Sequence, residues 1–282
     1  MTQRNGTTGA AGRKGEPRPA GRTRPTPGAR STGKGESGAV GETGGSLYVY
    51  AVVPAGTRLP VGAAGVGDPP AAPYTLREGA LDAVVSAAPA RLRARRRDLM
   101  AHQNLLTALA ESGPVLPMRF GAVAPAEDAL RTQLGAAEAE HLTTLERLAG
   151  HVEINVKALP ADDALAALVA GEPTVRRLRD AARRRPGYEA DVRLGEAVAA
   201  ALARRAADAG RQALHGLASM ARAVTTGPDV PGCALNVSFL VARSDTERFR
   251  AAAERFAAAH RDHVELRLAG PLPCYSFVGT GA

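Results

Sequence analysis

Alternation of apolar and polar positions predicts strands along most of the chain. Residues 152–157 alternate cleanly, with Val152, Ile154 and Val156 on one side, so we expect a half-exposed strand whose other side carries Glu153. Residues 47–53 are apolar on both sides, which is typical of a strand covered on both faces. Further strands are predicted at 74–77 and 81–86, as a hairpin, and at 235–241, 264–268 and 274–278.

Hydrophobic positions three and four residues apart predict helices between these strands. The predicted helices cover residues 90–110, 126–149, 162–170, beginning at Asp162 or Asp163, and 174–225. Pro186 and Gly187 are expected to break the last of these into two long helices that form an arm or hairpin. One more helix is expected after Ser244 and Glu247, whose spacing matches a capping box.

Prolines modify two of the extended segments. Pro117 lies inside the extended stretch 115–123, and because proline cannot donate to a sheet ladder we expect an edge strand or a bulged one. Residues 270–273, Gly-Pro-Leu-Pro, predict a rigid turn. The mixed order of strands and helices predicts an α+β fold, with ferredoxin-like elements after residue 150.

The first 46 residues differ from the rest of the 282-residue chain. They contain 12 of the 31 glycines, 8 Lys/Arg, 3 Asp/Glu and no aromatic residue, so we expect a disordered basic tail. The tail carries +5 of the net charge of +8, which leaves +3 for the remainder. Arginines outnumber lysines 33 to 3, which indicates a compositional bias and makes arginine abundance weak evidence for any partner.

Several functional classes are excluded by what the sequence lacks. No apolar stretch approaches the roughly 18 to 20 residues of a membrane span, and no apolar run near the start resembles a secretory signal. The two cysteines, Cys233 and Cys274, fit a reducing compartment, so we expect a cytoplasmic protein. No phosphate-binding loop or nucleophile elbow occurs in a suitable context. We therefore expect no cofactor, no small-molecule substrate and no enzymatic activity.

Three histidines and one cysteine are the candidates for site chemistry. His102 lies on the apolar side of its predicted helix, which favours a core or interface histidine over a catalytic base. His260 and His263, with Cys274, would need a fourth ligand to hold zinc, so surface histidines at a helix end are favoured. We expect no catalytic, cofactor-binding or metal-binding residues.

Two arginine clusters, at 91–97 and 176–185, leave three interpretations open. They are solvated helix faces, docking sites for an acidic protein, or a phosphate-binding surface for nucleic acid. No aromatic residue is interleaved with either cluster, which does not favour base stacking. A nucleic-acid-associated protein that uses the tail and these clusters remains the alternative function.

Two motifs at opposite ends of the folded region carry a family resemblance. They are Gly-Pro-Val-Leu-Pro-Met-Arg-Phe-Gly at 113–121 and Gly-Pro-Leu-Pro-Cys-Tyr-Ser-Phe-Val at 270–278. With the strands at 47–50, 152–157 and 235–241, in this order, the chain from 47 to 278 resembles the GvpL/GvpF family of gas vesicle accessory proteins.

This resemblance implies two α+β domains, at 47–149 and 150–282, the second a modified ferredoxin-like fold with a long helical insertion at about 174–225. It also implies an assembly or minor structural role on gas vesicles, with the hydrophobic shell protein and other accessory proteins as partners. An apolar surface or open sheet edge suits such a partner. Candidate contact residues are Arg119, Phe120, Tyr275 and Phe277; the alternative is that the aromatic residues are core and that Arg119 pairs with a buried carboxylate.

Overall fold

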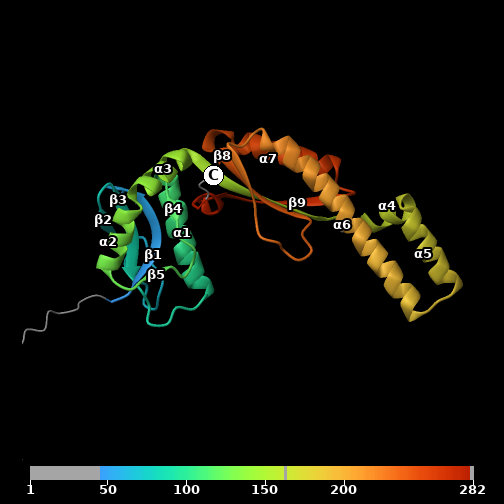
Figure 1. Ribbon diagram of the computed structural model, residues 1–282, viewed down its shortest axis with the longest axis horizontal. Helices are drawn as coiled ribbons and strands as arrows, with labels where there is room; N and C mark the ends of the chain where they lie inside the picture. Colours follow the sequence, from blue (N-terminus) through green and yellow to red (C-terminus); the bar gives the residue numbers. More distant parts are fainter. Residues whose placement is uncertain (1–44, 162–163, 280–282) are drawn as a thin grey trace, which may run out of the picture. The chain divides into compact units, whose positions relative to one another are not determined.

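The computed structural model describes residues 45–161 and 164–279 (Figure 1). All but the last two residues of the predicted tail lie outside the described residues, as does the predicted helix start at Asp162 or Asp163. Within the described ranges, helices and strands form a mixed architecture with two separate antiparallel sheets.

The first sheet is built around β1 (Leu47–Pro54). Its strand order is β2-β3-β1-β4, where β2 is Tyr74–Glu78, β3 is Leu81–Ala87 and β4 is Leu116–Pro117. A further short strand, β5 (Val123–Ala124), also pairs with β1. The predicted hairpin is confirmed as β2–β3, and β1 is buried on both faces as predicted.

Helices cover both faces of this sheet (Figure 1). Leu47 and Val49 pack with α2 (Glu127–Ala136) and α3 (Glu138–Leu148), whereas Tyr48 packs with α1 (Arg96–Ser112). The pairing of β1 with β3 is irregular between Val49 and Ala51, and Tyr50 and Ala51 both join the α1 side. Tyr48 and Tyr50 face α1 because alternate residues of a strand share a side, and the bulge moves Ala51 and Val53 to that side as well.

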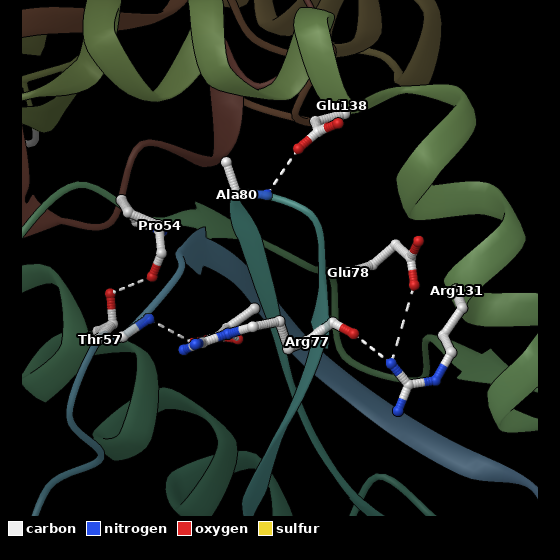
Figure 2. A network of polar contacts seen from close by, with 9 residues as sticks. Pro54, Thr57, Arg77, Glu78, Ala80, Arg131 and Glu138 are labelled. Carbon is white, nitrogen blue, oxygen red and sulfur yellow. Dashed lines mark hydrogen bonds and ion pairs between the residues drawn. The ribbon is translucent and has the colours of Figure 1, made fainter.

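Polar contacts fasten the β2–β3 hairpin to the helices (Figure 2). The backbone N–H of Ala80 donates to Glu138 Oε1 at 2.6 Å, and Arg131 donates to the Arg77 carbonyl while pairing with Glu78. Arg77 also forms two hydrogen bonds, of 2.9 and 3.0 Å, to the buried carboxylate of Asp82, and these hold the pKa of Asp82 below its ordinary value. The hairpin is therefore fixed in register by side chains as well as by the ladder.

The second sheet has the order β7-β8-β6-β9. Its strands are β6 (His151–Pro160), β7 (Ala223–Thr226), β8 (Leu235–Ala242) and β9 (Val264–Leu272). Helix α7 (Thr246–Ala259) and the C-terminal half of α6 (Tyr188–Ala218) cover the face that carries Ile154 and Val156. The strands predicted at 152–157, 235–241 and 264–268 are confirmed as parts of β6, β8 and β9.

The N-terminal half of α6 packs against two shorter helices, α4 (Ala164–Gly171) and α5 (Pro173–Arg184) (Figure 1). Leu168, Val175 and Ala201 form the buried centre of this group, which we call the α4–α6 arm. The predicted break at Pro186 and Gly187 is confirmed, because α5 ends before it and α6 begins after it. Within the described ranges, none of the helices combines the length and hydropathy that crossing a bilayer demands.

Three predicted helices have different bounds. The first begins at Arg96 rather than residue 90, and Leu92 reaches the core from outside the helix. The predicted helix 126–149 is divided at Ala137, whose φ of −109° and ψ of 10° depart from helical geometry. The helix predicted to continue to residue 225 ends at Ala218, because the β-branched residues 224–226 pair with β8 as part of β7.

The structure also differs from the sequence-based prediction in two extended segments and at one helix N-terminus. Residues 115–123 form β4 and then a turn before β5, and β4 lies at a sheet edge as predicted. The expected turn at 270–273 is instead largely the end of β9, which continues to Leu272 through an irregular pairing with β6. The expected capping box is absent: a 3₁₀ turn at Arg243–Asp245 precedes α7, whose first residues receive no side-chain cap.

The predicted last strand at 274–278 is wrong. The segment forms a 3₁₀ turn, Tyr275–Phe277, rather than a strand. Its backbone is held by a side chain and not by a ladder, because the N–H of Ser276 donates to the carboxylate of Glu153. A strand's period-2 pattern in so short a segment cannot exclude such a turn.

Candidate functional site

The motifs at 113–121 and 270–278 meet at one buried aromatic cluster. The backbone N–H of Gly121 donates to the Tyr48 hydroxyl at 3.1 Å. Phe120 and Tyr275 both pack on the cluster that contains Tyr48 and Tyr50. Two segments that are far apart in the sequence thus share a common support on β1.

His102 is held in a neutral form at the centre of this cluster. Its Nε2 lies 3.1 Å from the Met118 carbonyl oxygen, which can only accept, so Nε2 carries the proton. Its Nδ1 then accepts from the Tyr48 hydroxyl at 2.9 Å. Burial lowers the pKa of His102 and raises the pKa of Tyr48 to about 12. Both groups are neutral near pH 7, and the geometry is that of a core histidine joining α1 to the turn after β4.

Tyr50 fastens a second loop to the same strand. Its hydroxyl lies 3.0 Å from Ser86 Oγ and accepts from the backbone N–H of Val66 at 2.8 Å. Val66 belongs to the long connection between β1 and β2, and its side chain is fully buried. The tyrosines of β1 therefore position two different loops, the one containing Val66 and the one containing Gly121.

The four predicted contact residues have very different surroundings. Arg119 is exposed in the turn between β4 and β5, and among the described residues no carboxylate pairs with it. Phe120 is half-buried, with its ring centroid 5.9 Å from that of Tyr48 and 5.7 Å from that of His102. Tyr275 is half-buried as well, and burial raises its pKa to about 12. Phe277 is 2% exposed and belongs to the core, so only the first three have any surface for a partner.

A buried carboxylate that the sequence pattern placed toward solvent holds the second motif. Glu153 is 4% exposed. Its Oε1 accepts from Ser238 Oγ at 2.7 Å and from Ser276 Oγ at 2.6 Å, and its Oε2 accepts from the Ser276 N–H at 2.8 Å. The expectation of a half-exposed strand is thus wrong at Glu153, because the segment 273–278 covers that side of β6.

The scattered candidates for a metal site do not come together. Cys274 lies against the carbonyl of His151, at 3.9 Å from Sγ, and burial raises its pKa to about 12. His260 stacks on Phe256, with the ring centroids 4.0 Å apart. In the part of the chain that the structure describes, no three His, Cys, Asp or Glu side chains cluster in a way that could hold a metal ion.

An apolar hollow of about 180 Å³ lies beside the turn that carries Arg119. Most of its lining is apolar and comes from β1, from the 118–124 segment and from α2: Val49, Val52, Met118, Ala122, Val123, Ala124, Leu130 and Leu134. Gln133 of α2 and His141 of α3 are its polar lining residues. Val123 is 48% exposed and belongs to β5, a two-residue strand that pairs with β1. An apolar hollow beside a short outer strand can receive an apolar chain segment.

Comparison with known proteins identifies the family. The family model described as "Gas vesicle synthesis protein GvpL/GvpF" matches residues 46–279. Gas vesicle protein F of Streptomyces sp. (strain CB03234) is 42% identical over 237 residues, covering 83% of this chain and 99% of that protein. Gas vesicle protein L of the same organism is 32% identical over 259 residues, covering 82% of this chain and 92% of that protein.

Solved structures show the same fold. The crystal structure of GvpF from Microcystis aeruginosa superimposes with a TM-score of 0.64 at 21% identity, covering 83% of this chain and 99% of that one. GvpF from Anabaena sp. PCC7120 gives a TM-score of 0.66 at 21% identity, with 84% and 100% covered. The resemblance inferred from residues 113–121 and 270–278 is confirmed, and the chain belongs to the GvpL/GvpF family of gas vesicle proteins.

Proposed function

We propose that this protein acts in the cytoplasm as an assembly factor or minor structural component of gas vesicles. It binds the hydrophobic shell protein, and other accessory proteins, while the vesicle wall forms. The observation that carries this proposal is the apolar hollow beside β5, with Val123 exposed at its rim and Arg119 in the adjoining turn. Membership of a gas vesicle family supplies the biological context.

The physical reason is the chemistry of the partner. A wall subunit that is mostly apolar aggregates if it is released free into water, so a protein that delivers it must offer apolar surface. The 118–124 segment offers this surface next to a short edge strand, and Arg119 supplies a charge that keeps the unoccupied edge soluble. No step of this role needs a cofactor or a reacting group.

The division into two domains at residue 149, with a modified ferredoxin-like second domain, belongs to this proposal. Its support is that the first sheet is built entirely from residues 47–124 and the second entirely from residues 151–272. The first sheet is covered by α1, α2 and α3 and the second by α6 and α7, while Leu240, Cys274 and Phe277 from beyond residue 149 join the core of the first sheet. In this arrangement, the first domain carries the proposed shell-protein site.

The test compares two matched substitutions, Val123→Asp at the hollow and Val224→Asp on β7. Both valines are partly exposed on short outer strands, 48% and 39%, but they belong to different sheets. Each variant is co-expressed with a gas vesicle shell protein, and the soluble shell protein that co-purifies is measured. We expect Val123→Asp to reduce capture about tenfold and Val224→Asp to leave it unchanged.

A second variant separates contact from folding. Arg119→Ala removes an exposed side chain, so its melting temperature should stay within about 2 °C of the parent. Reduced capture at an unchanged melting temperature supports the proposed contact. Equal loss from Val123→Asp and Val224→Asp, or full capture by Val123→Asp and Arg119→Ala, would show that the hollow is not the site.

A further inference from the structure

Helix α5 has one apolar face and one basic face. Val175 and Ala182 are buried, and Val175 packs in the centre of the α4–α6 arm. On a helix of 3.6 residues per turn, positions 177, 180 and 184 lie opposite them, and positions 176 and 183 lie on the adjoining flank. The arginines among these, Arg176, Arg177, Arg183 and Arg184, are all exposed.

The positive charge of this face is poorly neutralised. Residues 173–185 contain six arginines and one acidic residue, Asp180. Asp180 is paired with Arg179 at 2.9 Å, and its pKa is lowered first by that hydrogen bond and further by the charges of Arg183 and Arg184. Among the described residues, no ion pair is formed by Arg176, Arg183 or Arg184. The face therefore presents two pairs of arginines to a partner.

We infer that this basic face of α5 binds an acidic helical segment of another protein. Arg176 and Arg183 are one heptad apart, as are Arg177 and Arg184, so the two members of each pair are about 10.5 Å apart along the helix axis. Glutamates or aspartates one heptad apart on a partner helix have the same separation. Guanidinium groups bind carboxylates with two parallel hydrogen bonds, so the match is geometric as well as electrostatic.

The extent of the face favours a protein over a nucleic acid. Duplex-binding proteins with strong salt dependence make about six to ten phosphate contacts, and this face offers four arginines. The positive surface does not continue along the chain, because Glu189 and Asp191 follow in the first turn of α6. Tyr188, 85% exposed between Arg185 and these acids, adds the kind of aromatic anchor that is common in protein interfaces.

This site is independent of the hollow proposed for the shell protein. It lies on α5, whereas the hollow is lined by β1, the 118–124 segment and the α2–α3 helices. A substitution on α5 that abolishes binding of the acidic partner should therefore leave shell-protein capture unchanged. Either proposal can be refuted without refuting the other.

The experiment uses paired charge reversals on two helices. The test variant is Arg176→Glu with Arg183→Glu; the control is Arg248→Glu with Arg255→Glu on α7, which are exposed and also one heptad apart. The change in net charge and the spacing are the same in both. Thermal unfolding followed by circular dichroism confirms that each full-length variant folds.

The probe is a fluorescent helical peptide with paired glutamates one heptad apart, and binding is followed by anisotropy at low salt. We expect the α5 reversal to weaken binding at least about tenfold and the α7 reversal to change it less than about twofold. A peptide of the same composition with its glutamates gathered at one end should bind more weakly.

Three results would overturn the inference. The first is equal weakening by both reversals, which would indicate a general charge effect. The second is tighter binding of a short DNA duplex than of the peptide, with the α5 reversal abolishing it, which would assign the face to nucleic acid. The third is a failure of the peptide test: the peptide with glutamates one heptad apart binds no more tightly than the peptide with gathered glutamates, or neither peptide binds.

Discussion

Glu153 and Ser276 are 123 residues apart in the chain, yet the Glu153 carboxylate accepts hydrogen bonds from both the backbone N–H and the hydroxyl of Ser276. The same carboxylate accepts from Ser238 on the neighbouring strand β8. A buried carboxylate with three donors is stable in a site that would otherwise penalise its charge. This contact holds the second family motif against β6.

Removing the carboxylate should destabilise the protein more than removing one donor. Glu153→Ala leaves the Ser238 hydroxyl and the Ser276 backbone N–H without their acceptor, and we expect a loss of about 2 to 4 kcal/mol in the free energy of unfolding. Ser276→Ala keeps the backbone donor and should cost about 1 to 2 kcal/mol. Urea unfolding measures both.

Ser244→Ala is the matched control, because Ser244 is exposed in the turn before α7 and should change stability by less than about 0.5 kcal/mol. A Glu153→Ala protein as stable as the control would mean that the segment 273–278 is not held by this carboxylate.

The strands of the second sheet could be predicted from the sequence because their pattern is local. Val152, Ile154 and Val156 alternate with polar residues, and all three are buried as the alternation indicates. The burial of Glu153 could not be predicted in this way. It depends on a segment more than a hundred residues later in the chain, and hydrophobic periodicity carries no information about such a contact.

The aromatic cluster shows the same limit. The sequence pattern predicts a strand over 47–53, which contains Tyr48 and Tyr50, and places His102 on an apolar helix face. The sequence gives no sign that Tyr48 and His102 share a hydrogen bond, or that the turn containing Arg119 is fixed by the Tyr48 hydroxyl. Family motifs indicated that residues 113–121 and 270–278 matter, and the structure supplies the reason: both pack on this one cluster.

Because His102 is buried in its neutral form, we expect the protein to lose stability on acidification. Burial lowers its pKa in the folded protein below the ordinary value of 6.5, so the unfolded chain binds the proton more readily. The contribution of His102 to the free energy of unfolding is fully present above pH 6.5, the pKa of the unfolded chain. It is lost as the pH falls from 6.5 to the lowered pKa of the folded protein. Urea unfolding at pH 7 and at about pH 5.5 should therefore show a lower free energy at the acidic pH.

His102→Gln removes the titrating group and should flatten the pH dependence of the free energy of unfolding below pH 6.5. The variant should be less stable at every pH, because the Tyr48 hydroxyl loses the His102 Nδ1 atom as its acceptor. His215→Gln, at an exposed position on α6, should keep the parent's slope. An unchanged slope in His102→Gln would assign the acid sensitivity to other groups.

Two glycines of α6 allow a test of how closely this helix packs on the second sheet. A Cβ at Gly210 would lie 3.1 Å from the Cβ of Ala158 on β6 and 3.3 Å from that of Leu235 on β8, closer than side chains ordinarily pack. A Cβ at Gly195 would meet nothing within 4 Å. The two positions share one helix, so the same substitution has the same intrinsic helix propensity at both.

Gly195→Val should therefore change the free energy of unfolding by less than about 0.5 kcal/mol, whereas Gly210→Val should lower it by about 1 to 3 kcal/mol through overpacking. The difference between the two variants, measured by urea unfolding, isolates the contact between helix and sheet from the propensity of valine. If Gly210→Val were as stable as Gly195→Val, α6 would have to lie farther from β6 and β8 at this point than these distances indicate, and the core formed by Ala158, Ala206 and Ala209 would be less tightly packed than described.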